Sequence, residues 1–250
     1  MKTTCPTATE MQRNALITGF TRGIGKAIAF NLAKQGFRLV LIYKNSDDLA
    51  KSVGEELSKL TQPLVIKCDV SDTKQIENAC ERAKEEFGFI DTLINNAGIS
   101  RFAFFDNETQ ESYDEVMNTN FRSVFTFCNI LCKDMISNKF GRIVNISSVW
   151  GKKPASTEVL YSASKSAVLG LTRSLNSELA PSGILVNAVC PGVIDTDMNA
   201  HFSQDDKQAI IDEIPLNRMG KAEEVASVVE LLTREELYIG GEEITVSSGF

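Results

Sequence analysis

Tyr161 and Lys165 are spaced as two side chains that could carry out acid–base chemistry together. Residues four apart on a helix are neighbours on its surface, and the pattern around this pair is helical. An ammonium beside a phenol favours the phenolate, so we expect the pKa of Tyr161 to fall below its ordinary value of about 10. Such a phenol could supply a proton to a developing alkoxide. The single histidine, His201, leaves few options for a Ser-His-Asp or Cys-His arrangement, which favours the tyrosine.

A second group of residues has the pattern of a phosphate-binding turn. The apolar run Asn14 to Thr18 leads into Gly19, and a helical pattern runs from Gly23 to Gln35. Gly19 permits a tight turn, Gly23 leaves room for a pyrophosphate, and Gly25 lets the helix pack closely on the strand. The helix N-terminus adds free N–H groups and partial positive charge. An ordinary glycine turn is the alternative, but the strand, turn and helix context predicts dinucleotide binding by a loop that also contains Thr21, Arg22 and Ile24.

The end of the second predicted strand bears on the choice of dinucleotide. An NAD site needs a carboxylate there to bind the adenosine ribose hydroxyls, but this strand ends in Tyr43-Lys44-Asn45. Lys44 and Arg22 instead supply two cations where a 2′-phosphate would lie. NADPH/NADP+ is therefore the predicted cofactor. The alternative is that Asp47 or Asp48 turns back to the ribose, although both have the position of acids at a helix N-terminus.

Strand and helix patterns alternate along the chain, which predicts a doubly wound α/β fold with a seven-stranded parallel sheet and helices on both faces. We expect one Rossmann domain over residues 13–250 after a flexible tail of residues 1–12. The predicted strands are Asn14 to Thr18, Phe37 to Tyr43, Leu64 to Cys68, Asp91 to Ile94, Arg142 to Ile146, Leu185 to Val189 and Glu243 to Val246. The predicted helices are Gly23 to Gln35, Asp47 to Leu60, Thr73 to Phe87, Gln110 to Ser137, Leu160 to Ala180, Ser203 to Glu213 and Ala222 to Thr233.

Composition narrows the possible functions. A net charge of −7 and the lack of a basic patch argue against nucleic-acid binding. The sequence has neither an apolar run long enough to span a membrane nor an apolar stretch typical of a signal peptide, so we expect a cytoplasmic protein that does not bind membranes. The six cysteines lack C-x-x-C pairs and suit reduced core positions. Cys128 and Cys132 lie one helical turn apart but lack third and fourth ligands, so we expect no metal site.

Further motifs, in this order, carry a resemblance to a known family. Asn95-Asn96-Ala97-Gly98 follows the fourth strand, Asn120 lies in the long helix, Ser148 precedes Tyr161 by thirteen residues, and Pro191-Gly192 closes the sixth strand. The chain resembles the short-chain dehydrogenase/reductase family over Arg13 to Phe250. The resemblance implies an enzyme that reduces a ketone to a secondary alcohol by hydride transfer from the nicotinamide, with Tyr161 as proton donor.

The resemblance also assigns roles to individual residues. Lys165 would hold the nicotinamide ribose, Ser148 would hydrogen-bond the substrate oxygen, and Asn120 would sustain a water chain that resupplies protons. Ser148 and Asn120 could instead form ordinary caps or helix bonds, and Asp69 could simply cap the following helix. The implied cofactor contacts are Asp69 and Val70 at the adenine, Asn96, Ala97 and Gly98 along the adenosine half, and Pro191, Gly192, Val193 and Thr196 at the nicotinamide amide.

Within the family, the broad pattern is similar to the 3-oxoacyl-(acyl-carrier-protein) reductases, through the glycine loop, Asn145-Ile146-Ser147-Ser148 and Ile214-Pro215-Leu216-x-Arg218. This implies a 3-oxoacyl thioester substrate and an acidic carrier protein as a partner that could present it, for which Lys139 and Arg142 are candidate contacts. Ser182 departs from the basic residue that those reductases often have. The resemblance further implies a homodimer or homotetramer paired through the two long helices.

Two other functions remain open. Local blocks, including Ser148-Val149-Trp150-Gly151 and Ala155 to Ser162, resemble reductases of a 5-aminopentanone group on elongation factor P, in which case Glu158 could pair with the substrate amine. Glu158 could equally be a capping or solvated residue. A non-catalytic NADPH-binding sensor or scaffold on the same fold is the alternative from another class.

Three segments are expected to contact the substrate. These are Ile99 to Phe105, Trp150, and a mobile lid from Asp197 to Ile214 that contains Met198, His201 and Phe202. The alternative for Phe102, Phe104 and Phe105 is that they pack beneath the edge of the sheet.

Overall fold

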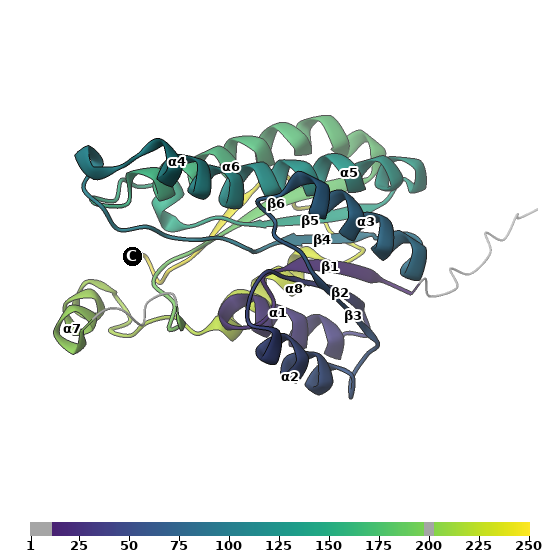
Figure 1. The fold of residues 1–250 in the computed structure, drawn as a ribbon, viewed down its shortest axis with the longest axis horizontal. Helices are drawn as coiled ribbons and strands as arrows, with labels where there is room; N and C mark the ends of the chain where they lie inside the picture. Colours follow the sequence, from purple (N-terminus) through teal and green to yellow (C-terminus); the bar gives the residue numbers. More distant parts are fainter. Residues whose placement is uncertain (1–11, 198–202) are drawn as a thin grey trace, which may run out of the picture.

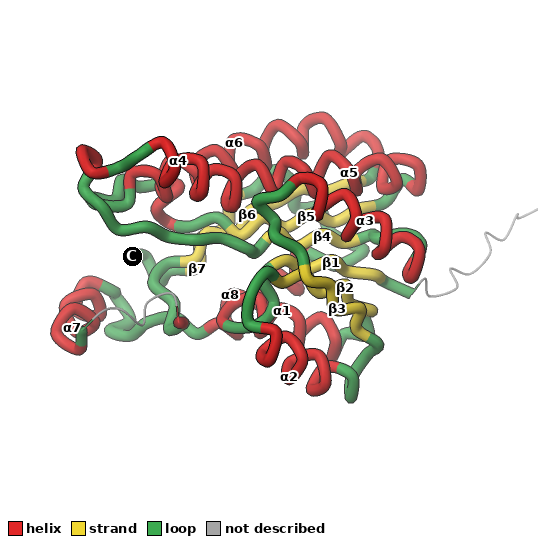
Figure 2. The backbone as a smooth tube through the Cα atoms, in the orientation of Figure 1, coloured by secondary structure: helices red, strands yellow, loops and turns green. Residues whose placement is uncertain are grey.

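Seven parallel strands form one sheet in the order β3-β2-β1-β4-β5-β6-β7 (Figures 1 and 2). The structure is a computed structural model that describes residues 12–197 and 203–250. The predicted seven-stranded parallel sheet is confirmed, and each strand begins and ends within two residues of its predicted bounds. The strands are β1 (Asn14–Thr18), β2 (Arg38–Tyr43), β3 (Pro63–Lys67), β4 (Thr92–Asn95), β5 (Gly141–Ile146), β6 (Ile184–Pro191) and β7 (Glu243–Val246).

Helices cover both faces of the sheet, as the alternating pattern predicts (Figure 1). Along β2, Leu39 and Leu41 pack into the core beneath one layer, while Val40 and Ile42 pack into the core beneath the other. Successive side chains of a strand point to opposite faces, so a run that is apolar throughout fits a sheet covered on both sides. One layer contains α1 (Gly23–Lys34), α2 (Asp47–Leu57) and α8 (Ala222–Leu232), and the other contains α3 (Thr73–Phe87), α4 (Gln110–Met117), α5 (Ser123–Asn138) and α6 (Val159–Leu179). A further helix, α7 (Gln204–Glu213), lies apart from both layers.

The long helix predicted over Gln110 to Ser137 is interrupted. A π-helical turn, Asn118–Arg122, separates α4 from α5. Such a turn inserts one extra residue into a helix and changes the direction of the side chains around it. Ser123 and Thr126 donate hydrogen bonds to the carbonyl oxygens of Thr119 and Arg122, which are additional side-chain bonds to the backbone of this turn. Asn120, in the middle of the turn, is buried.

Charged residues connect the starts of three strands at one edge of the sheet. Arg13 donates to Asp91 over 2.6 Å, and the guanidinium groups of Arg13 and Arg142 both lie against the ring of Phe140. Arg142 is buried and donates to the carbonyl oxygens of Arg234 and Glu235. Because its hydrogen bonds go to the backbone, Arg142 fixes the segment between α8 and β7 to the start of β5.

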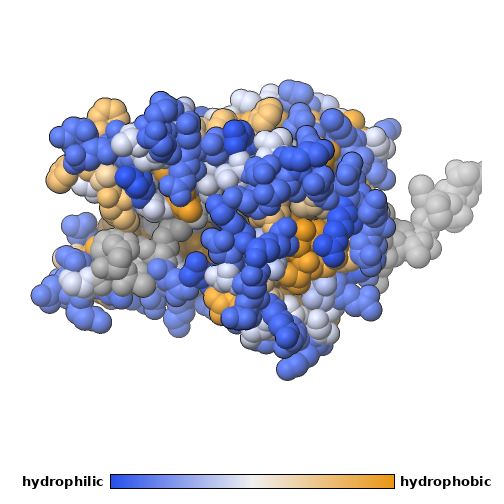
Figure 3. Space-filling view, in the orientation of Figure 1, coloured by the Kyte–Doolittle hydropathy of each residue, from blue (hydrophilic) through white to orange (hydrophobic). Residues whose placement is uncertain are grey.

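The face in Figure 3 is mostly polar, and most of the described cysteines are buried in the core, as the sequence predicts. Cys68, Cys80, Cys128 and Cys190 are buried free thiols, and burial raises the pKa of Cys128 to about 12. None of the helices in residues 12–197 and 203–250 is both long and apolar enough to cross a membrane. The same residues contain no group of three or more His, Cys, Asp or Glu side chains that could hold a metal ion. The predicted tail, apart from its last residue, lies outside the described residues.

Candidate active site

A cavity of about 580 Å³ opens at the carboxyl ends of the strands. The sheet order places β1 between β2 and β4, so chain connections run in opposite directions on the two sides of β1, which is where doubly wound proteins bind ligands. The structure brings together around this cavity all the sequence-predicted site residues except Asn120 and Val193. They are Gly19, Thr21, Arg22, Gly23, Ile24, Gly25, Lys44, Asp69, Val70, Asn96, Ala97, Gly98, Ser148, Tyr161, Lys165, Pro191, Gly192 and Thr196.

The glycine loop between β1 and α1 leaves no room for larger side chains. Gly19 has a φ of +72° and donates its N–H to the carbonyl oxygen of Ile42 over 2.8 Å. A Cβ on Gly25 would lie 2.0 Å from the carbonyl oxygen of Gly19, which is far inside van der Waals contact. Gly23 has a φ of +52°, and a Cβ there would lie 3.2 Å from a methyl carbon of Thr196. Within the described residues, no side chain caps the N-terminus of α1, so its N–H groups are available to an anion.

Asn96 holds this loop in place from the end of β4. Its amide nitrogen donates to the carbonyl oxygens of Thr18 and Gly19 over 2.9 and 3.0 Å. In return, the hydroxyl of Thr18 accepts from the backbone N–H groups of Asn96 and Ala97. Asn96 therefore has a structural function at the cavity, and its predicted contact with the adenosine half stays a prediction.

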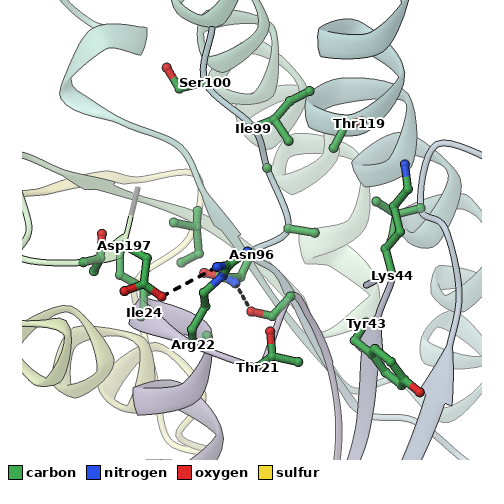
Figure 4. Close-up of a pocket in the computed structure, with 18 of the residues that line it drawn as sticks. Thr21, Arg22, Ile24, Tyr43, Lys44, Asn96, Ile99, Ser100, Thr119 and Asp197 are labelled. Atoms are coloured by element: carbon green, nitrogen blue, oxygen red, sulfur yellow. Dashed lines mark hydrogen bonds and ion pairs between the residues drawn. The ribbon is translucent and has the colours of Figure 1, made fainter. Parts of the chain in front are cut away.

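The far end of the cavity contains an ion pair. Lys44, at the end of β2, lies 2.8 Å from the carboxylate of Asp69. In Figure 4, Lys44 lies at the right and Ser100, from the segment after β4, at the upper left. Burial acts to raise the pKa of Asp69, but hydrogen bonds from Lys44 and Ser71 outweigh it and lower that pKa. Helix α3 is capped by Asp72, which accepts from Lys74 and Gln75. The alternative that Asp69 caps this helix is therefore wrong.

Two acids that could have served an NAD ribose are directed elsewhere. The carboxylate of Asp47 accepts from the hydroxyl of Tyr43 over 3.0 Å and pairs with Lys67 over 2.7 Å. Neither Asp47 nor Asp48 borders the cavity. Arg22, the second predicted cation, pairs with Asp197 over 3.7 Å between the glycine loop and the segment after β6 (Figure 4).

Ser148, Tyr161 and Lys165 meet at the other end, where β5 and α6 approach each other. All three are buried, with exposed fractions of 6, 8 and 4%. Lys165 donates from its ammonium to the carbonyl oxygen of Ile146 over 2.8 Å, and the same nitrogen lies 5.6 Å from the centre of the Tyr161 ring. The hydroxyl of Ser148 accepts from the N–H of Trp150, so Ser148 does act as a cap while it borders the cavity.

The predicted lowering of the Tyr161 pKa is wrong. Burial raises the pKa of Tyr161 to about 12; a hydrogen bond with Ser148 acts against this, and the negative charge of Glu158 adds to it. Burial also lowers the pKa of Lys165 to about 8. The neighbouring ammonium favours the phenolate, but the loss of water around the phenol is the larger effect. At neutral pH the phenol is therefore protonated and can act as an acid.

Asn120 lies behind the cavity wall. Its side chain accepts from the N–H of Ile99 over 2.8 Å and donates to the carbonyl oxygen of Ile99 over 2.9 Å. It also donates to the hydroxyl of Ser164, which donates in turn to the carbonyl oxygen of Tyr161. These partners lie outside the π-helical turn, so Asn120 does not form an ordinary bond within its own helix. Its predicted part in a proton-supplying water chain stays a prediction.

Several expected contacts are not found at this cavity. Val193 borders a smaller cavity of about 100 Å³ with Leu216 and Arg218, because the chain turns away from the main cavity after Gly192. Trp150 packs edge-on against Phe250 and does not border the main cavity.

The candidate carrier-protein contacts lie at the amino ends of the strands, opposite the cavity. Lys139 precedes β5 and Arg142 is its second residue, whereas the cavity lies at the other end of the strand. Arg142 is also only 4% exposed. Their positive charge made them candidates, but the direction of the strand places them away from the cavity.

The segment after β4 does reach the cavity. The cavity is bordered by Ile99, Ser100 and Phe102. The exposed fractions of Phe102, Phe104 and Phe105 lie between 46 and 68%. The alternative that these three rings pack beneath the edge of the sheet is therefore wrong. Glu158 is only 7% exposed, which rules out the solvated alternative. The predicted lid residues Met198, His201 and Phe202 lie outside the described residues.

Sequence reasoning missed two residues that α4 and the π-helical turn bring to the cavity, Glu115 and Thr119. They lie four residues apart, and Thr119 immediately precedes Asn120. This spacing puts them on one face of a helix, so the sequence could have predicted that they reach the cavity together.

The sheet, the glycine loop and the buried Ser, Tyr and Lys side chains define a dinucleotide-dependent oxidoreductase architecture. A family model described as short chain dehydrogenase matches residues 13–207. The chain therefore belongs to the short-chain dehydrogenase/reductase family and is an oxidoreductase.

Relatives extend over nearly the whole chain. It is 36% identical over 242 residues to 3-oxoacyl-(acyl-carrier-protein) reductase from Staphylococcus aureus, covering 96% of this chain and 98% of that protein. It is 40% identical over 241 residues to acetoacetyl-CoA reductase from Rhizobium meliloti, with the same coverage.

Among solved structures, it is similar to YwfH, an NADPH-dependent reductase involved in bacilysin biosynthesis, with a TM-score of 0.91, 31% identity and coverage of 95% and 98%. The actinorhodin polyketide ketoreductase with NADPH also has a TM-score of 0.91, with 32% identity and coverage of 97% and 98%. Neither an elongation-factor reductase nor a binding-only protein is among these four relatives.

Proposed function

We propose that this protein reduces the ketone of a 3-oxoacyl thioester to a secondary alcohol, with NADPH as the reductant and Tyr161 as the proton donor. The observation that carries the proposal is the meeting of Ser148, Tyr161 and Lys165 in the same cavity as the glycine loop. A binding-only protein would not need a buried phenol and hydroxyl at that place.

The shape and charge of the cavity fit NADPH. A Cβ on Gly19 or Gly25 would fill the turn, and the N–H groups that begin α1 face an anion site, so this loop would hold the pyrophosphate. Lys44 and Arg22 would bind the 2′-phosphate, and Lys165 would bind the nicotinamide ribose. The diversion of Asp47 to Tyr43 and Lys67 supports NADPH over NADH, because a ribose-binding carboxylate at β2 is what an NAD site needs.

When bound, NADPH supplies the hydride that adds to the carbonyl carbon. The carbonyl oxygen then carries the developing negative charge and needs a proton, which the Tyr161 phenol holds at neutral pH. The hydroxyl of Ser148 can donate a hydrogen bond to the same oxygen, and the Lys165 ammonium stabilises the phenolate that is left. The products would be the alcohol, NADP+ and a deprotonated Tyr161, which must regain a proton before the next turnover.

The substrate class comes from the relatives and from the cavity wall. The two curated relatives are named for a 3-oxoacyl group on a carrier protein and for acetoacetyl-CoA, and both of those substrates are 3-oxoacyl thioesters. Ile99 and Phe102 give the wall an apolar character that suits an aliphatic chain. Presentation by an acyl-carrier protein is part of this proposal, without the contacts at Lys139 and Arg142.

We also propose that copies of the chain pair through α5 and neighbouring helices. Tyr113 on α4, and Phe125 and Ile136 on α5, are each more than 40% exposed, which is unusual surface for helices that face only water. A homodimer or homotetramer would cover them.

The test is NADPH oxidation by the purified protein with acetoacetyl-CoA, with NADH as the matched control. We expect turnover that prefers NADPH. Binding of NADPH without turnover would overturn the 3-oxoacyl substrate and direct the search to a dedicated ketone. Equal turnover with both cofactors would overturn the cofactor assignment.

A further inference from the structure

Glu158 holds a carboxylate beside the cavity in a place where its burial is costly. It immediately precedes α6, lies three residues before Tyr161 and is 7% exposed. Its carboxylate accepts a hydrogen bond of 2.5 Å from the hydroxyl of Ser100, which belongs to the cavity wall. A neutral glutamine could accept the same bond without bringing a charge out of water.

The backbone immediately before Glu158 is strained. Thr157 has a φ of +64°, a conformation that branched residues rarely adopt. Its carbonyl oxygen accepts from the N–H of Ala103 over 2.9 Å. Strain of this kind persists only where surrounding contacts hold it, and it gathers at functional sites.

Three connections fasten the segment after β4 to the helix that carries Tyr161. Ile99 is bound by Asn120, whose side chain reaches Tyr161 through Ser164. Ser100 is bound by Glu158, and Ala103 is bound by Thr157. The wall formed by Ile99, Ser100 and Phe102 is thus fixed relative to the phenol.

We propose that Glu158 is a positioning residue, which holds this wall against the catalytic helix through Ser100 and places a fixed negative charge one helical turn from the Tyr161 phenol. The inference rests on the proposed ketone reduction. Its charge acts to raise the pKa of Tyr161, whereas the Lys165 ammonium favours the phenolate.

Other charged groups near Tyr161 act differently. Lys165 on α6 lies 5.6 Å from the ring centre and favours the phenolate, while Ser148 from the end of β5 is neutral. Glu115 from α4 borders the cavity, as do Arg22 and Asp197, which pair with each other. Glu158, immediately before α6, and Lys165, one turn after Tyr161, therefore place opposite charges on either side of Tyr161 along the chain.

The test separates the charge from the bond. Glu158→Gln removes the charge and keeps an acceptor for Ser100, while Ser100→Ala removes the bond and keeps the charge. Glu81→Gln makes the same chemical change at an exposed position of α3 and serves as the control. Thermal unfolding and NADPH binding confirm that each variant is folded.

The first measurement is the titration of the Tyr161 ring by NMR to alkaline pH, with the resonance assigned by its loss in Tyr161→Phe. We expect Glu158→Gln to move the titration about one pH unit lower, and Ser100→Ala and Glu81→Gln to leave it unchanged. A Glu158→Gln titration equal to that of the wild type would overturn the proposal. This measurement needs no substrate, so it decides the matter even if acetoacetyl-CoA is not turned over.

The second measurement is steady-state kinetics with acetoacetyl-CoA. We expect Ser100→Ala to raise the KM for the ketone about fivefold or more, because a loosened wall costs binding of that order, with the pH dependence of kcat unchanged. Glu158→Gln should show the reverse, with a nearly unchanged KM and an alkaline fall in kcat that begins at lower pH. An unchanged KM in Ser100→Ala would refute the connection through the wall.

Discussion

Lys165 donates from its buried ammonium to the carbonyl oxygen of Ile146, a bond of 2.8 Å between helix α6 and the end of β5. Burial lowers the pKa of this lysine to about 8, from an ordinary value of 10.5. The unfolded chain therefore binds this proton more tightly than the folded chain does. The charge reduces stability at neutral pH, and the loss is recovered as the pH rises from about 8 to 10.5.

Replacing this lysine should stabilise the protein while it abolishes activity. We expect Lys165→Met to raise the free energy of unfolding at pH 7 by about 2 kcal/mol, which is the proton-binding penalty less one hydrogen bond. The gain should shrink as the pH approaches 10. Denaturant unfolding at pH 7 and pH 10 measures it, with the exposed Lys133→Met as control. A variant no more stable than the wild type at pH 7 would contradict the argument.

Removing the Tyr161 hydroxyl should stop chemistry without preventing cofactor binding. We expect Tyr161→Phe to lower kcat with acetoacetyl-CoA by about 10²- to 10⁴-fold, the usual contribution of a positioned acid. The Kd for NADPH should change less than about twofold. Tyr238, which is fully exposed, offers the control Tyr238→Phe. If Tyr161→Phe turns over normally, another group supplies the proton.

The Lys44 side chain should distinguish the two nicotinamide cofactors. We expect Lys44→Ala to weaken NADPH binding about tenfold or more, the effect of losing one charge-assisted contact with a phosphate, and to leave NADH nearly unaffected. Lys51 is exposed on α2 and does not border the cavity, so Lys51→Ala is the matched control. Equal weakening of both cofactors by Lys44→Ala would refute 2′-phosphate recognition. The comparison requires only a binding titration.

A methyl group at Gly25 should disrupt the loop. It would lie 2.0 Å from the carbonyl oxygen of Gly19 and 2.5 Å from the amide nitrogen of Asn96. We expect Gly25→Ala to destabilise the fold by about 3 kcal/mol, the upper part of the range for overpacking, and to weaken cofactor binding. At Gly170, within α6, a Cβ would meet only the guanidinium of Arg173, at an ordinary contact distance of 3.9 Å, so Gly170→Ala should stabilise the helix by about 0.5 to 1 kcal/mol. Thermal unfolding of the two variants should therefore shift in opposite directions.

Features that depend on neighbours in the sequence were predictable. The glycine loop and the Tyr161 and Lys165 pair each follow from short spacings, and strands that are apolar on both faces indicate a sheet covered by two layers. The π-helical turn was not predictable in this way, because one extra residue in a helix leaves the apolar pattern nearly unchanged.

Features that depend on distant segments were harder to predict. The pKa of Tyr161 depends on burial by elements far apart in the sequence, and the ion pair of Lys44 and Asp69 joins the ends of two strands. Strand direction would have shown that Arg142 lies at the edge opposite the cavity. Its contacts with Arg234 and Glu235, across some ninety residues, could not be read from any local pattern.

The cluster of Arg13, Asp91 and Arg142 occupies the edge of the sheet opposite the cavity. A strand of five residues is about 17 Å long, and substitutions separated by more than about 10 Å usually add independently. Substitutions in this cluster and substitutions at the substrate end of the cavity should therefore have independent effects on stability and on substrate preference. A protein engineer could select variants at each end of the strands separately and then combine the best substitutions from both ends.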